Sequence, residues 1–231
     1  MRSDVPQVRR LVVVGLGLIG GSFAKGLRER GLCGEVVGFD LDPRSCDLAV
    51  ELGVVDRCAD SLAEACQDAD VIQLAVPILA MERLLAELAT LDLGNAVLTD
   101  VGSAKGNVVR CARDVFGRMP PRFVPGHPIA GSEQSGVTAA ESTLFRRHKV
   151  ILTPLEDTEP AALALVDGLW RALGADVEHM DVQHHDEVLA ATSHLPHLLA
   201  FGLVDSLAKR NENLEIFRYA AGGFRHYSKR S

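Results

Sequence analysis

The feature that most constrains this chain is a glycine-rich turn that follows directly on an apolar strand. Residues 9–14 are predominantly apolar and run into the pattern Gly-x-Gly-x-x-Gly, with the glycines at Gly15, Gly17 and Gly20. Gly15 permits a tight turn from strand to helix, Gly17 leaves room for a pyrophosphate beside the backbone, and Gly20 lets the helix pack close to the strand. The helix N-terminus then offers N–H groups and a positive dipole end to phosphates. The segment therefore predicts a dinucleotide-binding turn.

A second strand, residues 35–40, ends in Asp40, twenty residues after Gly20. A carboxylate at this place accepts hydrogen bonds from an adenosine ribose and repels a 2′-phosphate, so we expect NAD as the cofactor and regard NADP as less favoured. Arg44 is the one nearby residue that could pair with such a phosphate. The expected cofactor-binding residues are Gly15, Gly17, Leu18, Ile19, Gly20, Asp40 and Val76.

Strands and helices alternate along most of the chain, which predicts a doubly wound, mostly parallel α/β sheet of the Rossmann type. Further strands are expected at residues 54–56, 71–76, 96–100, 122–125, 149–153 and 175–178, the last two completing the same sheet. From residue 181 the strand signal disappears, and residues 182–210 suit a long helix bent near Pro196. We therefore expect a dinucleotide-binding domain over residues 1–180 and a helical domain over residues 181–231.

Composition narrows the class of protein. The formal net charge of -7 argues against general nucleic-acid binding, which needs clustered Lys and Arg. The five cysteines are odd in number and show neither a Cys-x-x-Cys motif nor a Cys/His metal spacing, which favours reduced thiols in a cytosolic protein. Neither a signal-peptide core nor an apolar run of transmembrane length occurs, so we expect a cytoplasmic protein without a membrane partner.

Three residues near strand ends could carry chemistry, because ligands of open α/β sheets bind beyond the carboxyl ends of the strands. Ser103 follows the strand at 96–100, and it could act in catalysis or simply cap the next helix. Lys105 lies in the first turn of that helix, where its charge opposes the dipole, which favours a functional role. His127 stands between Gly126 and Pro128 at another strand end, and an imidazole there can accept a proton at neutral pH.

A second group of histidines occurs in the helical segment, at His184, His185, His194 and His197. His194 and His197 are three residues apart and share a helix face. Two histidines without a nearby carboxylate make a weak zinc site, so we expect no metal and favour hydrogen bonds to a polar substrate or within the core.

Four motifs in the same chain resemble the prephenate/arogenate dehydrogenase family of tyrosine biosynthesis. They are GLGLIGGS at 15–22, DVGSAKG at 100–106, GHPIAGSE at 126–133 and SHLPH at 193–197. The resemblance implies a Rossmann domain followed by an all-α dimerisation domain, and hence a homodimer when the helical domain is complete. It also implies oxidative decarboxylation of prephenate or arogenate with hydride transfer to NAD.

The resemblance assigns roles to individual residues. It implies that His127 takes the proton of the substrate's ring hydroxyl, that Ser103 lies beside it, and that Glu133 stands at the pocket rim. It places His185, His194 and His197 on the substrate side. The segment GGFR at 222–225 resembles a family motif, which adds Arg225 to the substrate side; the arginine that grips a substrate carboxylate would fall at Lys229, which keeps the charge but not the bidentate fork. We expect the helical domain to be incomplete at residue 231.

Two other functions stay open at this point. One is a different β-hydroxyacid-type dehydrogenase, for which Lys209 would be the candidate catalytic lysine. The other is a nucleotide-binding protein without catalysis. The sequence does not decide between prephenate and arogenate, nor does it reveal control by tyrosine.

Overall fold

The computed structural model describes residues 7–131 and 134–194, together with residues 196, 198, 199, 202 and 205. The chain divides into two compact units, Met1–Gln183 and His184–Ser231. Among the helices that the structure describes, none combines the length and the apolar character needed to cross a bilayer.

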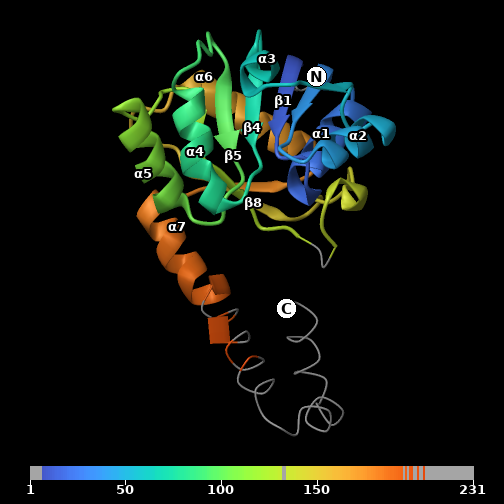
Figure 1. Ribbon diagram of the computed structural model, residues 1–231. Helices are drawn as coiled ribbons and strands as arrows, with labels where there is room; N and C mark the ends of the chain where they lie inside the picture. The colour runs from blue at the N-terminus through green and yellow to red at the C-terminus, as the bar shows by residue number, and fades with distance from the viewer. Residues whose placement is uncertain are drawn as a thin grey trace, which may run out of the picture. The chain divides into compact units, whose positions relative to one another are not determined.

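A six-stranded sheet forms the centre of the first unit, with the order β3-β2-β1-β4-β5-β6 and every neighbouring pair parallel. Figure 1 shows β1, β4 and β5 side by side, as the pairing requires. The strands are β1 (Val8–Val14), β2 (Cys33–Phe39), β3 (Arg57–Cys58), β4 (Val71–Leu74), β5 (Val97–Asp100) and β6 (Phe123–Val124). The expectation of a doubly wound parallel sheet is confirmed.

Helices cover both faces of this sheet (Figure 1). The helices are α1 (Leu18–Glu29), α2 (Pro43–Glu51), α3 (Leu62–Cys66), α4 (Ile78–Leu88), α5 (Lys105–Phe116) and α6 (Pro160–Ala172). One core contains α1 and α6, where Trp170 packs against Phe23 and Phe145 with ring centroids 4.6 and 4.9 Å away. The other core contains α3, α4 and α5. Alternate residues of the buried strands supply the two cores in turn, which is why these strands read as continuous apolar runs.

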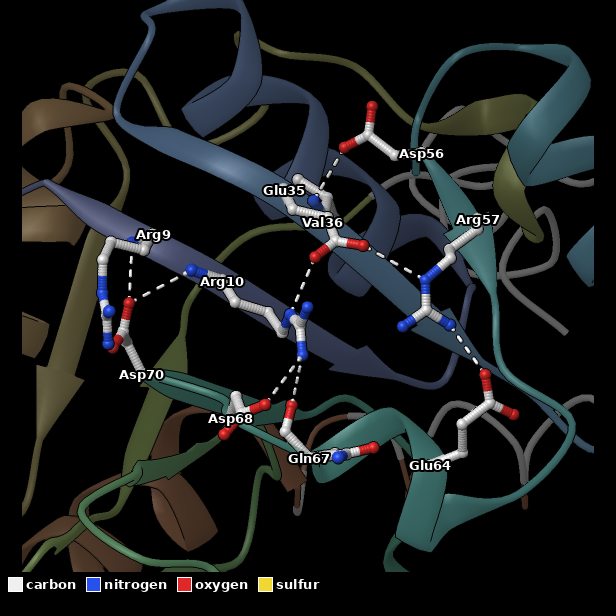
Figure 2. Close-up of polar contacts among 10 residues, drawn as sticks. All are labelled: Arg9, Arg10, Glu35, Val36, Asp56, Arg57, Glu64, Gln67, Asp68 and Asp70. Atoms are coloured by element: carbon white, nitrogen blue, oxygen red, sulfur yellow. Dashed lines mark hydrogen bonds and ion pairs between the residues drawn. The ribbon is translucent and has the colours of Figure 1, made fainter.

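An ionic network joins the amino ends of the first four strands (Figure 2). The carboxylate of Glu35 accepts hydrogen bonds from Arg10 Nε at 2.7 Å and from Arg57 Nε at 3.1 Å. Arg57 continues to Glu64 at 2.9 Å. Asp70 accepts hydrogen bonds from the backbone N–H of Arg9 at 2.7 Å and of Arg10 at 3.1 Å. These contacts fix the register of neighbouring strands at the amino edge.

The later strands do not complete this sheet, so that expectation is wrong. They form a second sheet in the order β7-β8-β9, with β7 (Gly126–Pro128) antiparallel to β8 (Lys149–Leu152) and β8 parallel to β9 (Asp176–His179). Pro125 separates β6 from β7; it has no N–H to donate to a ladder, and its carbonyl accepts a hydrogen bond from Thr153 N at 2.9 Å. The chain after Pro125 therefore pairs with β8 and does not extend the first sheet.

The strand expected at residues 54–56 lies instead at Arg57–Cys58. The N–H groups of Val54 and Val55 both donate to the carbonyl of Ala49, closing helix α2, so they are not offered to a neighbouring strand. Both side chains are buried, which explains the strand-like pattern. Ser103 does not cap the next helix: α5 begins at Lys105 and its N-cap is Ala104.

The long helix expected from residue 182 is interrupted earlier than Pro196. Helix α7 (Val182–Leu189) passes into a π-helical turn, η2 (Ala190–His194), and helical backbone is present again at Pro196. A proline ring clashes with the carbonyl four residues before it, here Thr192, and widening the turn relieves that clash. The Thr192 hydroxyl donates to Val188 O at 2.7 Å within the same turn.

Candidate active site

The carboxyl ends of the parallel strands meet at one edge of the sheet, opposite the ionic network. The strand order reverses direction between β1 and β4, so the loops after these two strands leave on opposite faces. Such a switch point opens a crevice for a ligand. The residues expected to bind a cofactor all lie at this edge, in the loops after β1, β2 and β4 and in the first turn of α1.

The glycine turn after β1 is fixed by close packing. Gly15 has a φ of +96°, which favours glycine, and a Cβ there would lie 2.5 Å from the carbonyl oxygen of Ala75 and 3.2 Å from Val76 Cγ1. A Cβ on Gly20 would lie 2.3 Å from the carbonyl oxygen of Gly15. The turn, the start of α1 and the loop after β4 are therefore in contact, and they bring Val76 beside Gly15.

Gly17 differs from Gly15 and Gly20 because a Cβ built on it would meet no protein atom within 4 Å. Its backbone is extended, with φ −91° and ψ −165°, and it is the N-cap of α1. Leu18 and Ile19 follow in the first turn of that helix, whose N–H groups have no intrahelical partners. The space beside Gly17 fits a pyrophosphate held by the helix N-terminus.

Asp40 stands at the end of β2 and is joined to the glycine turn. Its Oδ2 accepts a hydrogen bond from Leu16 N at 2.7 Å, and its Oδ1 accepts one from Asp42 N at 2.9 Å. The carboxylate is thus oriented by the backbone on both sides, half-buried at the edge of the sheet. This orientation suits acceptance of ribose hydroxyl hydrogen bonds.

A cavity of about 750 Å³ adjoins Asp40 between β2, α2 and β3. Its lining includes three further carboxylates, those of Asp47, Glu51 and Asp60. Burial and then the neighbouring Cys46 thiol and nearby carboxylates raise the pKa of the Cys58 thiol in the same wall, so this thiol stays protonated. Arg44 is outside the lining, and its side chain is highly exposed. The cavity is therefore anionic, which disfavours a 2′-phosphate.

A buried ion pair lies at the end of β5. Asp100 and Lys105 are both completely buried, and Lys105 Nζ donates to Asp100 Oδ2. Lys105 Nζ also donates to the carbonyl oxygen of Gly126 at 2.6 Å. The same Asp100 carboxylate accepts hydrogen bonds from Gly102 N at 2.8 Å and from Gly126 N at 3.2 Å. The pair thereby joins the loop after β5 to the first residue of β7.

Ser103 and His127 are the residues next to these two anchored glycines. Ser103 is exposed, directly after Gly102. His127 is half-exposed in β7, where it pairs with Ile151 of β8. The sequence interpretation singled out Lys105 but missed Asp100. The sequence did contain a signal for Asp100, because a charged residue at the last position of a strand requires a partner once it is buried.

The expected substrate residues are only partly described. His185 in α7 is buried, with Nδ1 2.8 Å from Asp186 Oδ1. His194 is the last residue of η2, and its side chain is outside the described part. Glu133, His197, Arg225 and Lys229, and also Lys209, lie outside the described residues. Among the residues that are described, no three His, Cys, Asp or Glu side chains are grouped to hold a metal ion.

Comparison with known proteins relates this geometry to a family. Residues 23–179 match the family model "Prephenate dehydrogenase, nucleotide-binding domain", and residues 181–230 match "Prephenate dehydrogenase, dimerization domain". The chain belongs to the prephenate dehydrogenase family. The resemblance carried by the four sequence motifs is thereby confirmed.

Two curated relatives and one solved structure show how far the similarity extends. The cyclohexadienyl dehydrogenase of Zymomonas mobilis is 35% identical over 222 residues, which cover 94% of this chain and 74% of that protein. The prephenate dehydrogenase of Bacillus subtilis is 37% identical, over 95% of this chain and 59% of that protein. The crystal structure of Aquifex aeolicus prephenate dehydrogenase in complex with hydroxyphenyl propionate and NAD+ has a TM-score of 0.87 at 38% identity, over 96% of this chain and 77% of that one. This chain thus spans about three fifths of the Bacillus subtilis enzyme.

Proposed function

We propose that this protein oxidises and decarboxylates prephenate or arogenate with NAD as hydride acceptor, in tyrosine biosynthesis. The observation that carries the proposal is the carboxyl edge of the sheet. There an open glycine turn beside Asp40 lies on the same edge as the loop that carries Ser103 and the strand β7 that carries His127, and these two segments share one buried anchor. Membership of the family supports the same activity.

The cofactor would be held by the residues expected from the sequence. The N-terminus of α1 and the space beside Gly17 fit the pyrophosphate, Asp40 fits the ribose hydroxyls, and Val76 forms part of the neighbouring wall. The anionic cavity next to Asp40 favours NAD over NADP. Bound NAD would supply the acceptor for the hydride that leaves the ring carbon bearing the hydroxyl.

His127 would then act on the hydroxyl of that same carbon. As the hydride leaves, the imidazole takes the hydroxyl proton, and the carbinol becomes a ketone. Loss of carbon dioxide sends the electrons of the broken C–C bond into the ring, the ketone oxygen becomes a phenolic oxygen, and His127 returns the proton to it. Aromatisation supplies the driving force, so the protein needs orientation and one positioned base. Ser103 would hold the substrate's ring hydroxyl and the His127 imidazole in position relative to each other.

The remaining site residues belong to the same proposal. Glu133 would stand at the pocket rim, and His185, His194 and His197 would line the substrate side. Arg225 and Lys229 would face the substrate's carboxylates, with Lys229 providing charge without a bidentate fork.

The organisation of the chain is proposed along with its activity. We place the end of the nucleotide-binding domain near Met180 and assign residues 181–231 to the helical domain. Because residues 181–230 match a dimerization domain, we propose a homodimer, which light scattering after size exclusion would test. The five free cysteines fit a reducing, cytoplasmic location.

A turnover assay tests the proposed function. Purified protein is mixed with prephenate or arogenate and with NAD or NADP, and reduced-nicotinamide absorbance and carbon dioxide release are followed together. We expect equal amounts of both products, and a loss of kcat of about 10²–10⁴-fold in His127→Asn with unchanged NAD affinity. Absence of turnover with both substrates, or near wild-type kcat in His127→Asn, would show the proposal to be wrong.

A further inference from the structure

The Asp100–Lys105 pair is costly for a small α/β domain to bury. Both side chains are completely excluded from solvent, and the lysine occupies the first position of α5, where its charge opposes the helix dipole. Replacement of a buried ion pair by apolar residues of similar size is often neutral or stabilising. Stability alone therefore gives little reason for the pair, and its hydrogen bonds point to another role.

Those hydrogen bonds converge on one residue of the main chain. Gly126 donates its N–H to Asp100 Oδ1 at 3.2 Å, and its carbonyl oxygen accepts from Lys105 Nζ at 2.6 Å. The two contacts hold the peptide planes on either side of Gly126. Because a peptide unit is planar, the plane fixed by Lys105 contains the nitrogen and Cα of His127. The pair thus fixes the position of the Cα atom from which the His127 side chain leaves the main chain.

The same carboxylate also holds the loop after β5. Asp100 Oδ2 accepts the N–H of Gly102 at 2.8 Å, and Ser103 is the next residue. One buried group therefore sets the backbone of both residues proposed to act on the ring hydroxyl. The two backbones are also close to each other, because a Cβ on Gly126 would lie 3.1 Å from the carbonyl oxygen of Asp100.

We propose that Asp100 and Lys105 are positioning residues for the reaction, which hold His127 and Ser103 in register through the main chain of Gly126 and Gly102. This inference rests on the proposed function. Both charged groups act through the backbone and not by contact with the reacting atoms. A displacement of a reacting group by about 1 Å can cost about 10²-fold in rate. Loss of the pair should therefore lower kcat and leave NAD binding unchanged.

The paired variant Asp100→Asn/Lys105→Met tests this, because it removes both charges together and leaves no unpaired charge buried. Thermal midpoint, NAD dissociation constant and steady-state kinetics are measured on the full chain. We expect a kcat about 10²-fold lower, with an NAD dissociation constant and a midpoint close to wild type. An unchanged kcat would overturn the inference.

A double-mutant cycle separates positioning from general structural damage. In the His127→Asn background the base is already lost, so adding the paired change should lower kcat little further. A general structural defect would lower kcat by the same factor in the wild-type and His127→Asn backgrounds, and that outcome would overturn the inference. The control variant Lys149→Met/Glu178→Gln removes an exposed ion pair between β8 and β9, beside β7, and should leave kcat unchanged.

A second variant decides the question if the paired variant does not fold. Gly126→Ala keeps the ion pair but places a methyl group 3.1 Å from Asp100 O and from Leu152 Cδ2, which shifts the same backbone by a few tenths of an ångström. We expect a lower kcat with unchanged NAD affinity, and an unaltered kcat would overturn the inference. A wild-type protein that turns over neither substrate overturns the inference and the proposed function together. An active wild type whose variants keep full kcat contradicts the inference alone.

Discussion

Two glycines of the same turn should respond to the same methyl group in opposite ways. A Cβ on Gly20 would lie 2.3 Å from the carbonyl oxygen of Gly15 and 2.9 Å from Ala75 Cβ and Val13 Cγ1. A Cβ on Gly17 would meet no protein atom within 4 Å, and its φ of −91° is open to alanine. Gly20→Ala should therefore damage the fold, whereas Gly17→Ala should damage ligand binding.

The size of each effect follows from these distances. The Gly20 contact is with backbone, which cannot swing aside, so α1 must move by about 1 Å; overpacking of this kind costs about 1–3 kcal/mol. At roughly 2–4 °C per kcal/mol for a chain of this size, the thermal midpoint should fall by several degrees. Gly17→Ala changes only an N-cap preference, worth about 0.5–1 kcal/mol. Its methyl group would fill the proposed pyrophosphate space, and a loss of about 1–3 kcal/mol there weakens NAD binding by roughly 5–150-fold.

Differential scanning fluorimetry and isothermal titration calorimetry with NAD measure the two effects on the same samples. Each variant serves as the control for the other, since both add one methyl group to one turn. The reasoning is refuted if Gly17→Ala binds NAD within twofold of wild type. It is also refuted if Gly17→Ala lowers the midpoint as much as Gly20→Ala does.

Three further predictions concern other parts of the chain. Asp40→Ser should narrow the preference for NAD over NADP by about tenfold or more in kcat/KM, because it removes a charged acceptor worth about 1.5–3 kcal/mol; an unchanged ratio would count against the ribose contact. Although burial opposes ionisation of Asp70, hydrogen bonds from the Arg9 side chain and from the backbone lower its pKa. The ionised carboxylate therefore stabilises the fold above its unfolded pKa of about 4, and this stabilisation is lost as the pH falls through the folded pKa. Asp70→Asn should thus lower the thermal midpoint at pH 7, and its difference from wild type should shrink as the pH falls below the unfolded pKa; a difference that does not change with pH would contradict the assignment. Trp170→Ala should cost about 3–5 kcal/mol in urea unfolding, whereas Leu52→Ala, at a residue 49% exposed, should cost little.

The sequence was most informative where the local geometry requires one particular type of residue. Gly15 needs a positive φ, Gly20 needs the absence of a Cβ, and Asp40 ends a strand beside the turn; all three local requirements are visible in a linear pattern. The alternation of strands and helices likewise indicates the fold class, because consecutive parallel strands of one sheet are joined by helical crossovers.

The sequence was least informative where the partner of a backbone group decides whether a segment forms a strand and in which sheet. Val54 and Val55 have the composition of a strand, but their N–H groups are taken by Ala49 at the end of α2. The second sheet depends on the diversion at Pro125, whose carbonyl meets Thr153. Strand propensity reveals neither partner: Ala49 lies only a few residues before the two valines, at the end of α2, whereas Thr153 is brought to Pro125 by tertiary packing.

The two edges of the sheet use charge in different ways, and the difference follows from exposure. At the amino edge the guanidinium groups of Arg10 and Arg57 remain partly exposed, so water and salt screen their pairing with Glu35 and each pair contributes little alone (Figure 2). At the carboxyl edge Asp100 and Lys105 are shielded from both, and each requires its partner in a definite geometry. Substitutions at the amino edge should therefore change the stability of the fold only slightly. A substitution at the carboxyl edge moves the main chain at Gly126, and it is at this edge that a shift of main chain would change the rate of reaction.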